Sequence, residues 1–171
     1  VGAMTGGGFY PTAWHDLASL TVQLTGLPIP VAVNLVNGCI GALVWPLSCI
    51  FLARVILGPT AAVTWVAAVL SAAFGAFPLL MVDFGVLYPN FLGISLLPAA
   101  LALGIQALGL GTAPGEGRAL SLILLVLMLP GLALAHPSSI MALLAFLAPA
   151  ALFRWWLSLR DTVRRQRVYV G

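Results

Sequence analysis

Five long apolar segments, separated by short breaks, dominate this sequence. Each is close to the roughly 20 residues that a helix needs to cross a bilayer. The breaks between them contain glycine, proline and polar residues, which end or kink helices by adding backbone freedom or removing a donor. The expected spans are 31–57, 60–81, 90–110, 118–135 and 138–158. The pattern predicts five membrane-spanning helices, kinked where prolines fall inside them.

A shorter apolar stretch, residues 12–25, precedes the first span. Its large apolar side chains recur at helical spacing, at Trp14, Leu17, Leu20 and Leu24. About 14 residues are too few to cross a membrane, so the pattern predicts a short interfacial helix. Thr12 is the expected N-cap, because threonine hydroxyls often accept a hydrogen bond from the first turn.

Composition supports the membrane interpretation. Hydrophobic residues make up 62% of the 171 residues and charged residues only 6%, whereas a soluble domain carries about 25% charged residues. The expected fold is therefore all-α, a polytopic transmembrane helical bundle forming a single domain over 1–171. Within it we expect an external segment at 1–30, spanning helices over 31–158 and a basic cytoplasmic tail at 159–171.

The positions of the cations predict the orientation of the bundle. All seven basic residues are arginines, and four of them, Arg160, Arg164, Arg165 and Arg167, lie near the C-terminus. Short cytoplasmic loops are enriched in Lys and Arg, so this tail predicts a cytoplasmic C-terminus in the cell membrane and no nucleic-acid partner. Counting spans backwards then puts every arginine on the cytoplasmic side.

The same count puts three polar segments on the opposite, external side: FYPTAWHD (9–16), VDFGVLYPN (82–90) and AHPSS (135–139). They contain the candidate catalytic residues His15, Asp16 and Asp83. A histidine can act as a general base or bind phosphate, and ionisable groups near a membrane boundary are often functional. A structural alternative stays open for each: a polar helix start for His15 and Asp16, where an acid suits the helix dipole, and a loop acid for Asp83.

Aromatic and polar residues of the same three segments are candidate substrate contacts. We expect them to surround one external cavity together with the candidate catalytic residues. Tyrosines before proline are also typical of interfacial turns, and a histidine before proline is often satisfied within its own turn. The candidates are Tyr10, Trp14, Tyr88, Asn90 and His136.

Two asparagines and two cysteines lie inside the first span. Asn34 and Asn37 are one turn apart, and we expect them to hydrogen-bond another helix. Cys39 and Cys49 are ten residues apart, or roughly 15 Å along a helix, which is too far for a disulfide.

The run FYPTAWHDLASLTVQLTGLPIPVAVNLVN, with the later VLYPNFLG, resembles a pattern in polytopic sugar transferases of the GT-C superfamily. The resemblance covers roughly residues 6–100 and extends to large actinobacterial membrane proteins of that type. It implies transfer of sugar from a polyprenyl-phosphate donor to a glycan acceptor on the external face, for assembly of the cell envelope. By this resemblance Tyr10, Trp14 and His15 line the donor-phosphate or acceptor site.

The same resemblance implies a catalytic acid upstream of the Tyr-Pro stretch. The chain starts at Val1 rather than at methionine, and we expect it to be part of a longer protein that carries this acid. The need for a divalent metal and the presence of other membrane subunits stay open. The competing hypotheses are a non-catalytic membrane scaffold and a lipid or solute transporter, which typically shows broken helices around a polar pathway.

Overall fold

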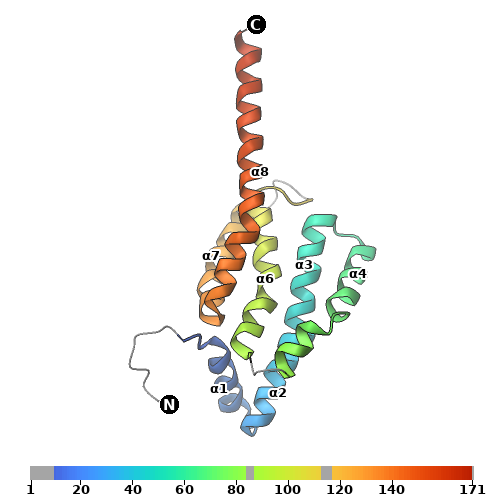
Figure 1. Ribbon diagram of the computed structural model, residues 1–171, viewed down its shortest axis with the longest axis vertical. Helices are drawn as coiled ribbons and strands as arrows, with labels where there is room; N and C mark the ends of the chain where they lie inside the picture. The colour runs from blue at the N-terminus through green and yellow to red at the C-terminus, as the bar shows by residue number, and fades with distance from the viewer. Residues whose placement is uncertain (1–9, 84–86, 113–116, 171) are drawn as a thin grey trace.

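A computed structural model describes residues 10–83, 87–112 and 117–170, with only the backbone described for 161–170. The described chain is all-α: it contains helices and turns and no strand. Figure 1 shows the helices standing side by side as a bundle, with the end of α8 projecting beyond it. The elements are α1 (Ala13–Thr25), α2 (Ile29–Cys39), η1 (Ile40–Val44), α3 (Trp45–Leu57), α4 (Ala61–Ala72), η2 (Ala76–Leu80), α5 (Met81–Asp83), α6 (Tyr88–Ala107), α7 (Arg118–Ala135) and α8 (Pro137–Val170).

Five stretches of this chain are long and apolar enough to span a membrane, as the sequence predicted. They are Ile29–Leu57, Ala61–Asp83, Tyr88–Ala107, Arg118–Ala135 and Pro137–Arg160. Their large apolar side chains remain widely exposed in the isolated bundle, which is the surface expected to face lipid. The chain is a multi-pass membrane protein.

The first span is continuous but changes its helical form midway. Residues Ile40–Val44 form a π-helical turn, η1, between α2 and α3. Pro46 is the second residue after this turn, and it has no N–H to donate to the carbonyl four residues earlier. A π turn shifts the hydrogen-bond pattern by one residue, and such turns are frequent at functional sites.

The short helix α1 lies at the end of the bundle where the first span begins, next to α2 (Figure 1). It ends at Gly26, whose φ of 69° is a left-handed conformation that glycine adopts readily. The predicted cap at Thr12 is wrong: the Thr12 side chain makes no capping hydrogen bond, because its backbone is in a helical conformation rather than the extended one a cap needs.

The second span is broken directly before Pro78, one of the prolines at which the sequence predicted a kink. The helix α4 stops at Ala72, and Phe77 has an extended backbone (φ −141°, ψ 131°) inside the following turn. A helix end leaves carbonyls without partners, and in lipid these groups must be satisfied. The indole N–H of Trp45, in α3, donates to the Ser71 carbonyl at 2.7 Å.

The third span, α6, is the centre of the bundle. Half of the residues in its most apolar stretch are buried inside the bundle, whereas only 6% are buried in the second and fifth spans. Phe91, Ala100 and Leu103 of this helix are among the buried residues. Gly104 brings α6 against Leu147 of α8, since a Cβ there would lie 2.6 Å from the leucine side chain. The helix is mostly apolar around its circumference, as expected for a helix that packs against several neighbours.

The helices alternate in direction, so their connections gather at two ends (Figure 1). One end holds α1, the end of α5, the start of α6 and the α7–α8 turn. The other end holds the α3–α4 turn, the end of α6, the start of α7 and the long C-terminal part of α8. We call them the aromatic end and the arginine end, because Arg54, Arg118 and the C-terminal arginines all lie toward the second.

Candidate functional site

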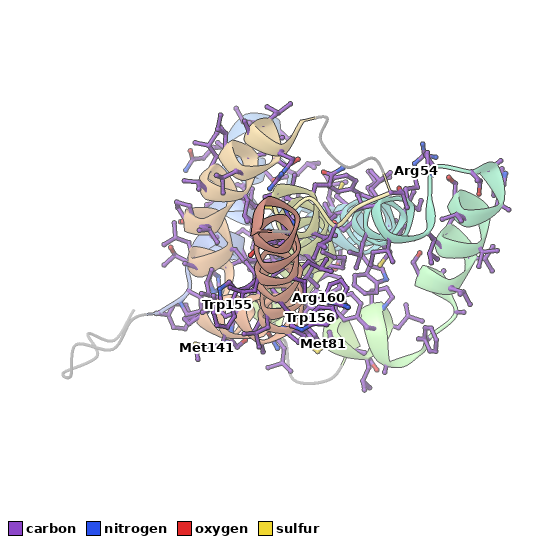
Figure 2. The ribbon with its side chains drawn as sticks, turned by 90° about the horizontal axis from the view of Figure 1, so that it is seen from above. Arg54, Met81, Met141, Trp155, Trp156 and Arg160 are labelled. Atoms are coloured by element: carbon purple, nitrogen blue, oxygen red, sulfur yellow. The ribbon has the colours of Figure 1, made fainter. Side chains whose placement is uncertain are left out.

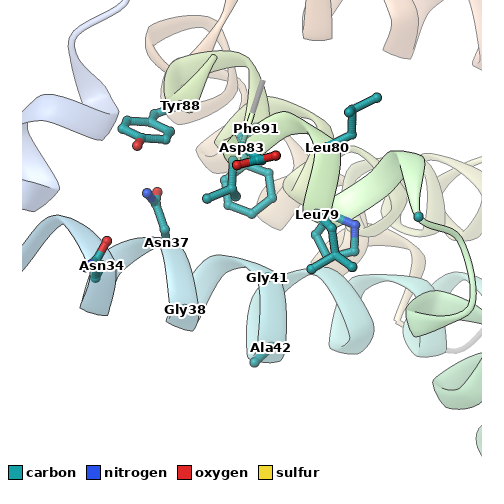
Figure 3. A pocket seen from close by; sticks show the side chains of 13 residues that line it. Asn34, Asn37, Gly38, Gly41, Ala42, Leu79, Leu80, Asp83, Tyr88 and Phe91 are labelled. Carbon is teal, nitrogen blue, oxygen red and sulfur yellow. The ribbon is translucent and has the colours of Figure 1, made fainter. Parts of the chain in front are cut away.

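A large cavity lies between the first span, the broken second span and α6, and its lining includes Asp83 and Tyr88 at the aromatic end. Its volume is about 920 Å³, within the range of ligand sites. Figure 3 shows Asn34 and Asn37 on the helix at one side, with Asp83 and Tyr88 across from them. The lining residues are Asn34, Asn37, Gly38, Gly41, Ala42, Gly75, Pro78, Leu79, Leu80, Val82, Asp83, Tyr88 and Phe91.

The first span presents one small and polar face to this cavity. Its five lining residues are spaced as neighbours on one side of a helix: 34, 37, 38, 41 and 42. Gly38 leaves open space, because a Cβ there would meet nothing within 4 Å. Gly41 is closed off, because a Cβ there would touch Phe91 at 3.4 Å. This spacing was the sequence signal for the cavity, and it was not recognised.

Asn37 is held in one orientation by α1. The Trp14 indole N–H donates to Asn37 Oδ1 at 3.0 Å, and both side chains are buried, with 4% and 6% exposed. The expected bond from Asn37 to another helix is therefore confirmed. Asn37 Nδ2 has no partner among the described residues. Asn34 is exposed at the cavity, and no hydrogen bond from its side chain is found in the described part of the chain.

Asp83 is the acidic residue of the cavity. It ends α5, immediately before the connection to α6, and Figure 3 shows its carboxylate beside the Phe91 ring and near Leu80. Among the described residues it has no ion pair or hydrogen-bond partner, and no basic side chain lines the cavity. An unpaired carboxylate in such a place can accept a hydrogen bond from a ligand hydroxyl.

Tyr88 joins the cavity to the aromatic cluster around α1. Its ring lies 4.5 Å from that of Trp14, centroid to centroid. The Phe77 ring, in the broken second span, lies 5.4 Å from Phe91 and 4.4 Å from Trp45. These distances are close to those of favourable aromatic pairs, so the contacts hold together the helices that carry the polar residues of the cavity.

Tyr10 and His15 lie on the other side of Trp14. The Tyr10 hydroxyl is 3.0 Å from His15 Nε2, and the two rings stack at 5.6 Å. His15 lines a separate groove of about 390 Å³ between α1 and α2. The prediction that it shares one cavity with Asp83 is wrong, because successive residues point about 100° apart on a helix: Trp14 faces the core and His15 faces away.

The remaining candidates lie at the same end but not in the cavity. His136 Nδ1 lies 2.6 Å from Ser138 Oγ and accepts from the Ser138 backbone N–H at 3.3 Å. Ser138 Oγ in turn is 3.5 Å from Asn90 Oδ1. These contacts satisfy a turn between α7 and α8, which agrees with the structural alternative for His136. Asp16 is exposed on the first turn of α1 and lies outside the cavity.

Within residues 10–83, 87–112 and 117–160, no three His, Cys, Asp or Glu side chains come together as metal ligands would. Cys39 and Cys49 are free thiols, as their spacing predicted. The chemistry of the cavity therefore rests on one carboxylate, two amides and a phenol.

Family comparison gives a family and no activity. A model of the family described as "Family of unknown function (DUF6541)" matches residues 1–171, and the chain belongs to this family. No curated protein and no solved structure matches the chain.

Proposed function

We propose that this member of the DUF6541 family is an integral-membrane glycosyltransferase, or part of one, that takes sugar from a polyprenyl-phosphate donor. In this proposal the cavity opens on the extracytoplasmic face of the cell membrane, the C-terminus is cytoplasmic, and the product is a glycan of the envelope. The observation that carries the proposal is the carboxylate of Asp83, which has no partner among the described residues and lies across the cavity from the amides of Asn34 and Asn37. Hydroxyl groups of a sugar match these donors and acceptors.

The walls of the cavity support a substrate that is part sugar and part hydrocarbon. Leu79, Leu80 and Val82 form an apolar side, which suits the chain of a lipid-linked substrate. Tyr88 and Phe91 offer aromatic surface for a sugar ring. An apolar pocket with a few convergent polar groups is the usual form of a small-molecule site.

Asp83 is the proposed general base. Its carboxylate takes the proton of the acceptor hydroxyl as that oxygen attacks the anomeric carbon. The bond from this carbon to the donor phosphate breaks, and the phosphate leaves with the electron pair. No cation among the described residues lines the cavity, so the proposal requires a cationic group outside this set to neutralise the leaving phosphate.

The test is transfer of labelled sugar from a polyprenyl-phosphate donor by the full-length protein. General bases contribute about 10²–10⁴-fold to rate, so Asp83→Asn should lower transfer by at least about a hundred-fold. Asp16→Asn, at an acid exposed outside the cavity, should lower it far less. Equal activity of Asp83→Asn and wild type, with both folded by thermal melt, would remove Asp83 from the mechanism.

A transporter is the second candidate, and the broken second span favours it. Discontinuous helices beside a binding site are typical of secondary transporters, and η2 and α5 line the cavity directly. Proteoliposomes distinguish the two: sugar transfer without net movement of a solute supports the enzyme. Movement of a solute across the bilayer that Gly38→Leu blocks, with no transfer, supports the transporter.

A further inference from the structure

A second, smaller cavity lies at the arginine end, where no function has been assigned. Its volume is about 260 Å³. It is bounded by the last turns of α3 and α6, the turn before α4 and the residue Thr112 after α6. The lining residues are Phe51, Arg54, Val55, Pro59, Gln106 and Thr112.

Arg54 is oriented by a neighbouring helix. One guanidinium nitrogen, Nη1, donates to Thr64 Oγ1 in α4 at 2.8 Å. The Thr64 hydroxyl in turn donates to the Thr60 carbonyl at 3.0 Å, so its own proton is already used. The other guanidinium N–H groups have no partner within the described residues and remain as donors.

Gln106 adds a second donor to the same cavity. Its Oε1 accepts from the Ser121 hydroxyl of α7 at 3.1 Å, which orients the amide and leaves Nε2 as a donor. The Thr112 hydroxyl and backbone N–H are used elsewhere, since they donate to the carbonyls of Arg54 and Val55. The side-chain donors of the cavity that remain without a described partner are therefore N–H groups of Arg54 and Gln106, and Arg54 carries a positive charge.

Donors around a cation suit an anion, and no acidic side chain among the described residues lies near these donors. The acidic side chains that the structure describes, Asp16 and Asp83, are both at the aromatic end. A planar guanidinium matches the geometry of phosphate oxygens. Phe51 lies one turn deeper in the span than Arg54 and offers an apolar surface beside the charged one.

We infer that this cavity binds the phosphate group of an anionic phospholipid from the leaflet at the arginine end. The lipid source follows from position: the cavity lies where three spanning helices end, so a headgroup can enter while its chains stay in the bilayer. Basic pockets between spanning helices are known lipid-headgroup sites. The inference does not depend on glycosyl transfer at the other end of the bundle.

Native mass spectrometry of the full-length protein in detergent tests this site. Wild type should retain phosphatidylglycerol in preference to phosphatidylcholine. Arg54→Gln should raise the Kd for phosphatidylglycerol by about ten-fold, because it removes a charge-assisted hydrogen bond. The matched control is Arg160→Gln: Arg160 lies over the Trp156 ring of α8 at 4.5 Å and is well apart from Arg54 in Figure 2.

A second variant keeps the test decisive if Arg54→Gln fails to fold. Gln106→Glu can still accept from Ser121 but places a negative charge at the cavity, so it should weaken phosphatidylglycerol binding at least as strongly. Unchanged binding in Gln106→Glu, or equal weakening in Arg160→Gln, would overturn the inference. Binding of inorganic phosphate without any preference for phosphatidylglycerol over phosphatidylcholine would show that the cavity takes a soluble anion, and the lipid assignment would be wrong.

Discussion

The two ends of the bundle use polar residues in opposite ways. At the aromatic end, Asn37 and Asp83 face a large cavity that no described basic side chain lines. At the arginine end, Arg54 and Gln106 face a small cavity with donors and without a described acid. Both cavities lie next to the second span. Its end at Asp83 lines the larger cavity, and near its start Thr64 orients Arg54 of the smaller one. Charge is thus separated along the bundle: the cavity at the arginine end should favour an anion, and the Asp83 cavity should favour groups that donate hydrogen bonds, such as sugar hydroxyls.

Filling the larger cavity should have the greatest effect. Gly38→Leu places a side chain in open space, so it should block the cavity without disturbing the helix. A displacement of about 1 Å in an active site costs roughly a hundred-fold in rate, and exclusion of substrate should cost at least that much sugar transfer. Binding of phosphatidylglycerol at the arginine end should not change.

Gly131→Leu is the matched control for this variant. Gly131 is also an exposed glycine within a spanning helix, and a Cβ there also meets nothing within 4 Å. It lies in α7 and does not line the cavity. If both variants reduce transfer equally, the loss comes from the leucine itself and not from the cavity.

The bond between α1 and the first span should have the next largest effect, on stability. Asn37→Leu leaves the buried Trp14 indole N–H without an acceptor, which costs about 1–3 kcal/mol of unfolding free energy. Asn34→Leu, at an exposed position on the same helix, should stay within about 0.5 kcal/mol. Chemical unfolding in detergent measures both. A larger loss in Asn34→Leu would mean that the two asparagines have been assigned the wrong roles.

The bundle was predictable from the sequence, whereas the contents of its cavities were not. Runs of apolar residues set the five spans and the short helix, because lipid requires long helices with satisfied backbones. The extended backbone of Phe77 has a local cause, because the residue before a proline, here Pro78, disfavours the helical conformation, whereas the contacts of Phe77 with Trp45 and Phe91 depend on the tertiary structure. His15 and Asp83 lie at the same end of the bundle, but His15 is on a face of α1 that lines a different groove from the Asp83 cavity.

Candidate site residues were easiest to recognise in the sequence where a polar side chain is surrounded by apolar ones. Asp83 stood out because it follows a purely apolar run. Asn37 was recognised as a helix–helix contact, but its place at a cavity required knowing which face of the first span meets α6. The Gln106 donor had no sequence signal, since its orientation depends on Ser121, 15 residues away.

Accessibility labelling of the two ends tests the central claim, that the Asp83 cavity opens outside and the arginines lie inside. Single cysteines at Leu87 and Gln166, in a protein with Cys39 and Cys49 replaced by alanine, report the two ends. A membrane-impermeant thiol reagent should label position 87 in intact cells, and position 166 only after the cells are opened. Labelling of position 166 in intact cells, with position 87 protected, would contradict the account and move the cavity to the cytoplasmic face.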